Sequence, residues 1–327
     1  MRLNSQNVNS QSPPVLNAQG YKSPPKNPRL PAGGFVKIQA FAKINLYLEV
    51  LGKRADGYHD IFSVMQSVDL CDDLIISVDF DAFDKTAQAR LICGVSGIPA
   101  DEKNLVIKAA NVLIREYGLK QNLKFELTKR IPMGAGLAGG SSDCAATLLG
   151  INKLLNLNIP FEKLIEIGKS LGADVPFCLT SGTAVTEGIG EKIKPLPPHP
   201  PCFILIACPE IHVSTAKIFS RFDIKNIKQQ NCERRENFIN IFEKKDLSQI
   251  ALSLYNIFTP ITAGLHPEIS DLILKFRNIG ALGAEMSGTG SSVFAFFDNE
   301  KTAQKAFNII KKSVTKVFLC KPINRGD

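Results

Sequence analysis

The sequence predicts an α+β protein of two domains. Strand-like runs and helix-like runs are mixed along the chain, and a segment with five prolines in eight positions, 194–201, separates two halves of ordinary composition. The 327 residues, 44% of them apolar, are enough for two ordinary domains. We therefore expect domains at 36–193 and 202–322. Residues 1–35, rich in Ser, Asn, Gln and Pro, are expected to be a disordered extension.

The elements of the first half follow from periodicity. Alternation at Leu123, Phe125 and Leu127 is typical of a half-buried strand, and Asp56-Gly57 marks a turn between two strand-like runs. A helix is expected to start near Ser141 or Ser142. The remaining expectations are strands over 61–78, 89–93 and 177–186 and helices from 104 and over 161–171.

The second half reads as a smaller mixed domain. Helical patterns occur near residues 214, 238, 247 and 268 and over 301–313, and strand patterns occur at 202–208, 281–287, 293–297 and 317–321. This mixture of the two periods predicts an α+β domain.

Composition excludes several classes of function. The net charge is +8, but Lys and Arg are scattered among the acids, which disfavours a nucleic-acid interface and suits an anionic small substrate. No apolar run is long enough to span a bilayer. Eight cysteines without a C-x-x-C pair indicate buried, reduced thiols in a cytoplasmic protein, and four histidines make a structural zinc site improbable, so no metal-ligating residue is assigned.

A loop of glycines and serines between the strand at 123–127 and the following helix is the strongest functional signal. Unpaired N–H groups and the helix dipole favour an anion there, and glycine lets backbone approach a phosphate. A capped turn with no ligand is the alternative. The loop contains G-x-G-x-x-G in a poor context for a dinucleotide fingerprint, and it lacks the lysine of a P-loop. A cation for phosphate chemistry must come from elsewhere.

Lys43 is a candidate for that cation because it lies within a strongly apolar run. The alternative is a residue at a strand edge whose ammonium is in water. Asp174, in a turn before Pro176, is either a common turn aspartate or the carboxylate that orients an attacking hydroxyl. Tyr58 and His59 either belong to a surface hairpin or hold a flat ring. The loop 286–292 is either a hairpin turn or backbone that approaches the nucleotide.

The segments 132–142 and 287–292, with the lysine-bearing segment before them, occur in the order of the GHMP kinase superfamily, which this chain resembles over roughly residues 36–322. The resemblance implies a two-domain GHMP kinase fold, an N-terminal ATP-binding domain with a C-terminal ferredoxin-like α+β domain, and ATP with Mg²⁺ as cofactors. The segments 42–46, 54–59 and 172–176 resemble a subgroup whose substrate is a cytidyl diphosphate sugar alcohol.

The resemblance also implies roles for individual residues. Lys43 and Asp174 would be catalytic, and Asn45 would contact the reacting end of the substrate. Tyr58 and His59 would recognise the cytidine, with Phe219 stacking on its far side and Thr215 near the diphosphate. The residues implied to bind ATP are Pro132, Met133, Gly134, Ala135, Gly136, Leu137, Ala138, Gly139, Gly140, Ser141 and Ser142.

Two alternatives remain within this reading. A sister kinase acting on homoserine or a mevalonate derivative would have no base to recognise, and a silent member would bind nucleotide without catalysis. Ala138 departs from the family because that position is often glycine. The expected partners are ATP and the small-molecule substrate, without nucleic acid or membrane, and the expected state is a monomer or weak homodimer.

Overall fold

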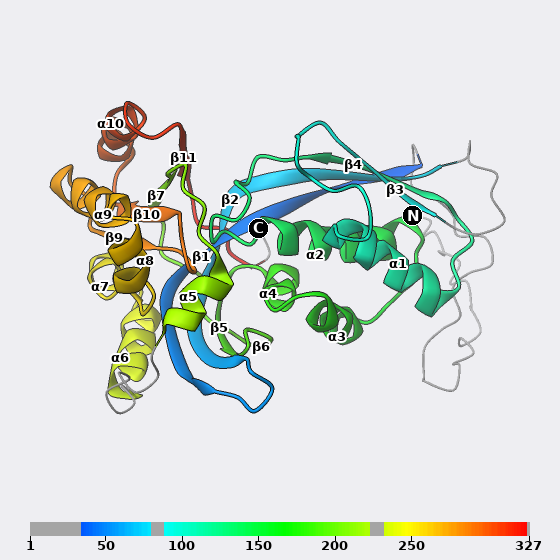
Figure 1. The fold of residues 1–327 in the computed structure, drawn as a ribbon, viewed down its shortest axis with the longest axis horizontal. Helices are drawn as coiled ribbons and strands as arrows, with labels where there is room; N and C mark the ends of the chain where they lie inside the picture. The colour runs from blue at the N-terminus through cyan, green and yellow to red at the C-terminus, as the bar shows by residue number, and fades with distance from the viewer. Residues whose placement is uncertain (1–33, 80–87, 223–231, 326–327) are drawn as a thin grey trace, which may run out of the picture.

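A computed structural model describes residues 34–79, 88–222 and 232–325. The molecule is elongated, with one sheet and its helices on the right of Figure 1 and a second, smaller sheet with its helices on the left. The predicted disorder of residues 1–35 falls, except for the last two positions, outside the described residues. Strand β1 begins at Phe35. In the described part of the chain, no helix combines the length and the apolarity that crossing a bilayer requires.

The first sheet has seven strands and is organised around two long ones. β1 and β2 pair antiparallel along most of their length, and the order is β3-β4-β2-β1-β8, with β5 on β2 and β6 on β5. The strands are β1 (Phe35–Lys53), β2 (His59–Val78), β3 (Ala89–Cys93), β4 (Leu123–Thr128), β5 (Thr183–Gly188), β6 (Lys192–Pro195) and β8 (Tyr255–Asn256). The turn that joins β1 to β2 is the predicted hairpin, in which Arg54 N–H donates to Tyr58 O at 2.8 Å.

Helices cover one face of this sheet. They are α1 (Leu105–Tyr117), α2 (Gly139–Leu154), α3 (Phe161–Leu171) and α4 (Val175–Thr180). Side chains such as Leu74 and Ile76 of β2, Phe125 of β4, and Leu148 and Ile151 of α2 are completely buried in one apolar core. Burial of this apolar surface holds α2 under the long strands, so the loop that precedes α2 is fixed at the sheet.

The second sheet has the ferredoxin-like arrangement that was expected. Its strands are β7 (Phe203–Cys208), β9 (Gly283–Met286), β10 (Val293–Phe297) and β11 (Lys316–Cys320), in the antiparallel order β11-β7-β10-β9. The helices of this half are α5 (Thr215–Arg221), α6 (Cys232–Glu243), α7 (Leu247–Leu252), α8 (Thr259–Leu265), α9 (Glu268–Asn278) and α10 (Glu300–Ile310). The predicted two-domain α+β fold is therefore confirmed.

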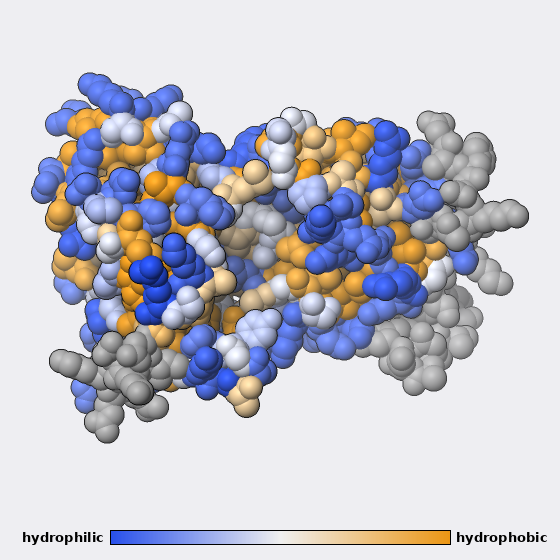
Figure 2. Space-filling view, viewed as in Figure 1, coloured by the Kyte–Doolittle hydropathy of each residue, from blue (hydrophilic) through white to orange (hydrophobic). Residues whose placement is uncertain are grey.

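The two halves are joined at more than the proline-rich segment. β8 belongs to the second half of the chain but pairs parallel with β1, at Tyr47 and Leu48. At the C-terminal end, Ile323 N–H donates to Ser67 O of β2 at 2.9 Å. A shared core contains Tyr47 of β1, Phe238 of α6 and Phe294 of β10. These contacts fix the two halves on either side of a cleft, which Figure 2 shows as a hollow near the middle of the molecule.

Two local expectations differ from the structure. The segment 177–186 is not one strand, because helix α4 occupies Val175–Thr180 and β5 starts only at Thr183. A short apolar run cannot be assigned by periodicity alone, and here Pro176 occupies the first turn of a buried helix. Helix α2 begins at Gly139, before the predicted Ser141 or Ser142, since Ala138 takes the cap position with a left-handed φ of 55°.

Candidate active site

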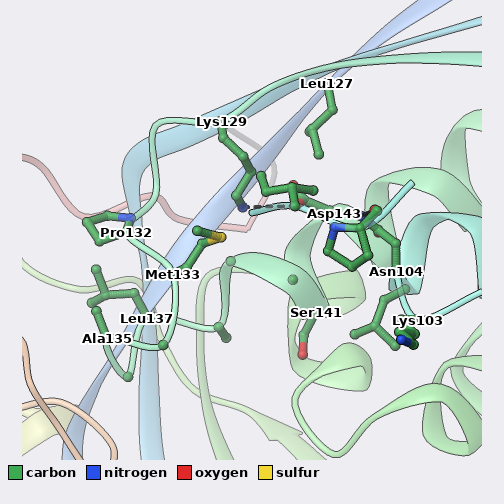
Figure 3. Close-up of a pocket in the computed structure, with 18 residues that line it drawn as sticks. Lys103, Asn104, Leu127, Lys129, Pro132, Met133, Ala135, Leu137, Ser141 and Asp143 are labelled. Carbon is green, nitrogen blue, oxygen red and sulfur yellow. Dashed lines mark hydrogen bonds and ion pairs between the residues drawn. The ribbon is translucent and has the colours of Figure 1, made fainter. Parts of the chain in front are cut away.

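The loop 132–138 and the start of α2 surround a cavity of about 380 Å³, shown in Figure 3. Ten of the eleven residues implied to bind ATP line it, from Pro132 to Ser141. Gly134 and Gly136 have positive φ angles of 63° and 79°, which turn the backbone around the cavity. The first N–H groups of α2 have no partner within the helix. The cavity therefore has the shape and the polarity of an anion site.

A buried ion cluster holds both ends of this loop. Lys129, just before the loop, pairs with Asp143 of α2 at 2.9 Å and with Asp72 of β2. Asp72 Oδ1 also accepts from the backbone N–H of Ile131 at 2.9 Å. Burial raises the pKa of Asp143 to about 7, although the Lys129 ammonium opposes that rise. The cluster ties the strand before the loop to the helix after it.

Ser142 is the one member of the predicted ATP set that the structure turns away from the cavity. Its side chain is buried, and its hydroxyl donates to Phe41 O at 2.5 Å and lies 3.3 Å from Cys178 Sγ. Ser142 thus connects α2 to β1 and α4 in this structure. Ser141, by contrast, lines the cavity.

Lys43 and Asp174 meet beside the loop. Lys43 Nζ lies 3.9 Å from Asp174 Oδ2, and their side chains are 5% and 31% exposed. The ammonium is therefore buried, which contradicts the alternative of a strand-edge lysine in water. Lys43 is on β1, whereas Asp174 caps α4, and Lys43 N–H donates to Leu137 O of the phosphate loop at 3.1 Å. A buried ammonium therefore lies beside a loop that has no lysine of its own.

Asn45 lies next to Lys43 and is fully engaged with protein groups. Its Oδ1 accepts from Lys43 Nζ at 2.7 Å and from Gly288 N–H at 2.9 Å. Its Nδ2 donates to Ser63 Oγ at 2.9 Å. Asn45 nevertheless lines the small cavity of about 300 Å³ in front of Lys43 and Asp174.

The residues expected to hold the cytidine surround a larger cavity of about 830 Å³. It is lined by Tyr58 and His59 from the hairpin and by Thr215 and Phe219 from α5. His59 and Phe219 have ring centroids 5.2 Å apart, so no third ring fits between these two. Burial, assisted by the nearby Lys53, lowers the pKa of His59 and favours the neutral imidazole. Tyr58 is 62% exposed at the rim.

The three cavities adjoin one another through shared lining residues. The small cavity shares Gly136, Ala138 and Ser141 with the cavity of the phosphate loop. It shares Thr215 and Phe219 with the larger cavity lined by Tyr58, His59 and Phe219, which we call the aromatic cavity. A phosphate donor at one end and a ring-bearing acceptor at the other would therefore meet at Lys43 and Asp174.

Several lining residues are not predictable from the sequence alone. Ile189 and Ala173 line both the small cavity and the aromatic cavity, and Gly288 and Thr289 line the small cavity. The small-residue loop 286–292 had been singled out, so its approach to the site had a signal. Ile189 had none, because an isoleucine in a turn after a strand has no chemical signature.

Two domains with a phosphate loop, a lysine and an aspartate in the cleft define a small-molecule kinase. The GHMP kinases N terminal domain matches residues 104–182, and the GHMP kinases C terminal domain matches residues 238–316. The chain belongs to the GHMP kinase family.

The similar proteins are named more narrowly. A 4-diphosphocytidyl-2-C-methyl-D-erythritol kinase of Caldicellulosiruptor bescii is 42% identical over 286 residues, covering 87% of this chain and 97% of the relative. A crystal structure of 4-(cytidine 5'-diphospho)-2C-methyl-D-erythritol kinase superposes with a TM-score of 0.74 at 27% identity, covering 88% of this chain and 99% of the other. A homoserine kinase from Cytophaga hutchinsonii shares the fold, with a TM-score of 0.72 at 22% identity, covering 90% and 96% of the two chains.

Proposed function

We propose that this protein transfers the γ-phosphoryl group of ATP to the 2-hydroxyl of 4-diphosphocytidyl-2-C-methyl-D-erythritol, in the non-mevalonate route to isoprenoid precursors. The observation that carries the proposal is the series of three cavities that meets at Lys43 and Asp174. A relative named for this activity matches 87% of the chain at 42% identity.

Asp174 acts on the attacking hydroxyl. Its carboxylate faces the small cavity and lacks a side-chain bond to the helix that it caps, so it is free to accept the hydroxyl proton. The oxygen then forms a bond to the γ-phosphorus while the bond from that phosphorus to the ADP oxygen breaks. The Lys43 ammonium stabilises both the Asp174 carboxylate and the negative charge of the phosphoryl group during transfer.

The loop 132–142 holds the phosphates of ATP with backbone N–H groups, and no lysine of its own is needed. Mg²⁺ would neutralise phosphate charge during transfer. In the described ranges no three His, Cys, Asp or Glu side chains gather as a metal site. Mg²⁺ commonly keeps several waters and is bound through one or two carboxylates together with the phosphates of the substrate.

The aromatic cavity selects the cytidyl end of the acceptor. Because His59 and Phe219 are already in contact, the base is expected to stack between Tyr58 and Phe219, with His59 at its edge. A neutral imidazole has one donor and one acceptor nitrogen and can bond the edge of a pyrimidine. Thr215 lines both the small cavity and the aromatic cavity, which supports a contact with the diphosphate of the substrate.

Homoserine and mevalonate derivatives would leave the aromatic cavity of about 830 Å³ empty. The deciding experiment is therefore an assay with ATP and Mg²⁺ against the cytidyl substrate, homoserine and mevalonate side by side. We expect kcat/KM for the cytidyl substrate to exceed the other two by orders of magnitude. Equal or better use of homoserine would overturn the assignment of the acceptor.

We also infer a cytoplasmic enzyme that is a monomer or weak homodimer. All eight cysteines are free, and burial raises the pKa of several, such as Cys208 to about 11. Buried free thiols of this kind suit a reducing compartment. The exposed large apolar side chains belong to separate segments of the described chain. Light scattering over a range of concentrations tests the assembly state.

A further inference from the structure

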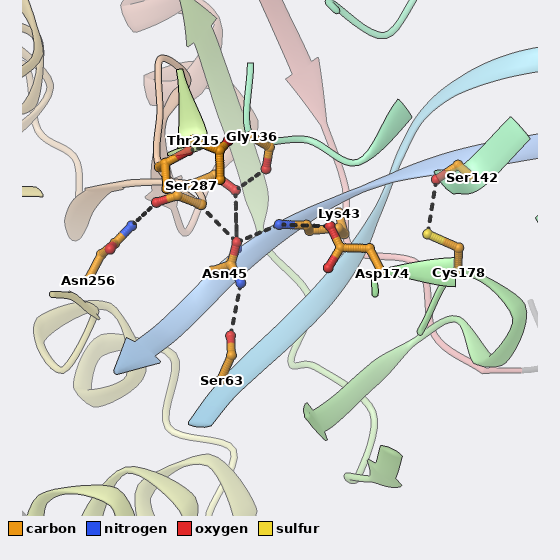
Figure 4. A network of polar contacts seen from close by, with 12 residues as sticks. Lys43, Asn45, Ser63, Gly136, Ser142, Asp174, Cys178, Thr215, Asn256 and Ser287 are labelled. Carbon is orange, nitrogen blue, oxygen red and sulfur yellow. Dashed lines mark hydrogen bonds and ion pairs between the residues drawn. The ribbon is translucent and has the colours of Figure 1, made fainter. Parts of the chain in front are cut away.

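Ser287 is a buried residue of the second domain that lies against the catalytic strand of the first. It follows β9 directly and has no exposed surface. Its Oγ accepts from the backbone N–H of Asn45 at 3.3 Å and donates to Gly136 O of the phosphate loop at 2.9 Å. One hydroxyl of the C-terminal half thus contacts both strand β1 and the nucleotide loop (Figure 4).

The neighbouring backbone reinforces this contact. Gly288 N–H donates to Asn45 Oδ1, and Asn256 of β8 fixes the same loop by donating from Nδ2 to Gly288 O at 2.7 Å. On the other side, Ser63 of β2 accepts from Asn45 Nδ2. Contacts with Lys43 of β1, Ser63 of β2 and Gly288 therefore hold the side-chain amide of Asn45 in a single orientation.

This orientation determines where the Lys43 ammonium lies. A lysine side chain is long and flexible, and it loses much conformational entropy when it is fixed in one position. Here the shortest contact of Lys43 Nζ is with Asn45 Oδ1, at 2.7 Å, whereas Asp174 is 3.9 Å away. The amide oxygen, more than the carboxylate, sets the position of the ammonium.

We propose that Ser287 is a positioning residue that acts through Asn45 on the Lys43 ammonium. The second domain thereby contributes to the transfer step without touching the transferring phosphate. This inference rests on the proposed role of Lys43. A displacement of the ammonium by about 1 Å is enough for a large loss of rate, because transition-state stabilisation depends on exact placement of charge.

An alternative role for Ser287 is to support the phosphate loop, 132–142, through its hydrogen bond to Gly136 O. The two roles differ in kinetics. Loss of loop support weakens ATP binding and raises KM for ATP, whereas loss of Lys43 placement lowers kcat at unchanged KM. Ser287 Oγ lies 3.3 Å from the backbone N of Asn45 and 3.4 Å from its Oδ1, and this double contact favours the second role.

The test compares Ser287→Ala with Ser291→Ala in full-length protein. Ser291 is equally buried in the same loop, but its hydroxyl donates to Pro209 O at 3.3 Å, away from Asn45. We expect Ser287→Ala to lower kcat roughly tenfold or more, with KM for ATP and for the acceptor within about twofold of wild type. Ser291→Ala is expected to retain kcat within about twofold.

An unchanged kcat in Ser287→Ala, or a raised KM for ATP at constant kcat, would overturn the proposal. Thermal unfolding of each variant shows whether the protein is folded at the assay temperature. If Ser287→Ala is not folded, Ser63→Ala removes the opposite anchor of the same amide and is expected to give the same loss of kcat at unchanged KM. Full activity in a folded Ser63→Ala would then overturn it.

A double variant separates a relay from two independent effects. If Ser287 acts through Asn45, the double variant Asn45→Ala/Ser287→Ala should have a kcat no lower than that of the more damaged single variant. Multiplied losses would refute the relay. The assays use whichever acceptor wild type phosphorylates best, so an error in the proposed acceptor shows in wild type and leaves this comparison intact.

Discussion

Lys43 Nζ and Asp174 Oδ2 lie 3.9 Å apart, although the lysine belongs to the first strand and the aspartate begins helix α4. The lysine is buried and the aspartate is partly open to the small cavity. Both side chains line the small cavity, but they should behave differently on substitution, because a carboxylate can accept a hydroxyl proton and an ammonium cannot.

Asp174→Asn is expected to lower kcat by about 10²–10⁴-fold, because the amide cannot accept the hydroxyl proton. The side chain makes no capping bond to α4 and is partly solvated, so folding should be preserved. Turnover assays together with ATP titration of the folded variant check both parts. Undiminished turnover would refute the role of Asp174, and loss of ATP binding would show a different one.

Replacement of Lys43 should separate its chemical role from its packing. Lys43→Met retains the length of the buried stem but removes the donor to Asn45 Oδ1, so the free energy of unfolding should fall by about 1 kcal/mol. Lys43→Ala leaves a cavity and should cost about 2 kcal/mol or more. Both variants should lose about 10²-fold or more in kcat. A Met variant with near wild-type kcat would exclude the ammonium from transfer.

Tyr58→Ala and Phe219→Ala should raise KM for the cytidyl substrate and leave KM for ATP nearly unchanged. Stacking of a base on an aromatic side chain contributes about 1–3 kcal/mol, so a rise of about tenfold or more is expected. Tyr58 is exposed and gives the cleaner test, whereas Phe219 also packs on Phe258 at 4.6 Å between centroids. Equal effects on both ligands would assign these rings to the core alone.

Patterns of local sequence predicted much of this structure. The alternation at Leu123, Phe125 and Leu127 identified β4 because period two is specific to strands. The glycines of the loop 132–142 indicated a backbone site for anions, and the roles of Lys43 and Asp174 came from the resemblance to a family. Helix α4 was mistaken for a strand because a buried six-residue helix lacks a polar face.

Contacts between distant segments could not be predicted in the same way. The pairing of Lys43 with Asp174 depends on how α4 packs against α2, and the contact of Ser287 with Asn45 depends on the docking of the two domains. Neither is encoded in spacing along the chain. The same applies to Ser142, which was expected at the phosphates by its neighbours in sequence but whose hydroxyl contacts Phe41 and Cys178.

Gly136→Ala should disrupt the contact between the phosphate loop and the second domain. A Cβ at this position would lie 2.1 Å from Ser287 O, and φ is +79°. The matched control is Gly134→Ala, where φ is +63° but no atom lies within 4 Å of the new Cβ. The control should cost about 1–2 kcal/mol from backbone strain alone. Gly136→Ala should cost clearly more and lower kcat/KM, and equal losses in the two variants would contradict the close approach.

The free energy of unfolding should fall at acidic pH because of His199. Its ring packs edge-on against Phe242 and Phe296, and Nδ1 lies 2.7 Å from Pro200 O. Burial lowers the pKa of His199 to about 4, from the 6.5 that is usual for a histidine in an unfolded chain. The unfolded state therefore binds the proton first, so the contribution to stability is complete above pH 6.5 and is lost as the pH falls towards 4.

The loss amounts to about 3 kcal/mol across that range, since one pKa unit corresponds to 1.36 kcal/mol. His199→Leu, which cannot be protonated, should remove this part of the pH dependence even if its stability at pH 8 is lower. His212→Gln is the matched control, because His212 is exposed. Urea unfolding at a series of pH values between about 4 and 8 measures the slope. A slope unchanged in His199→Leu would show that other groups govern the acid sensitivity.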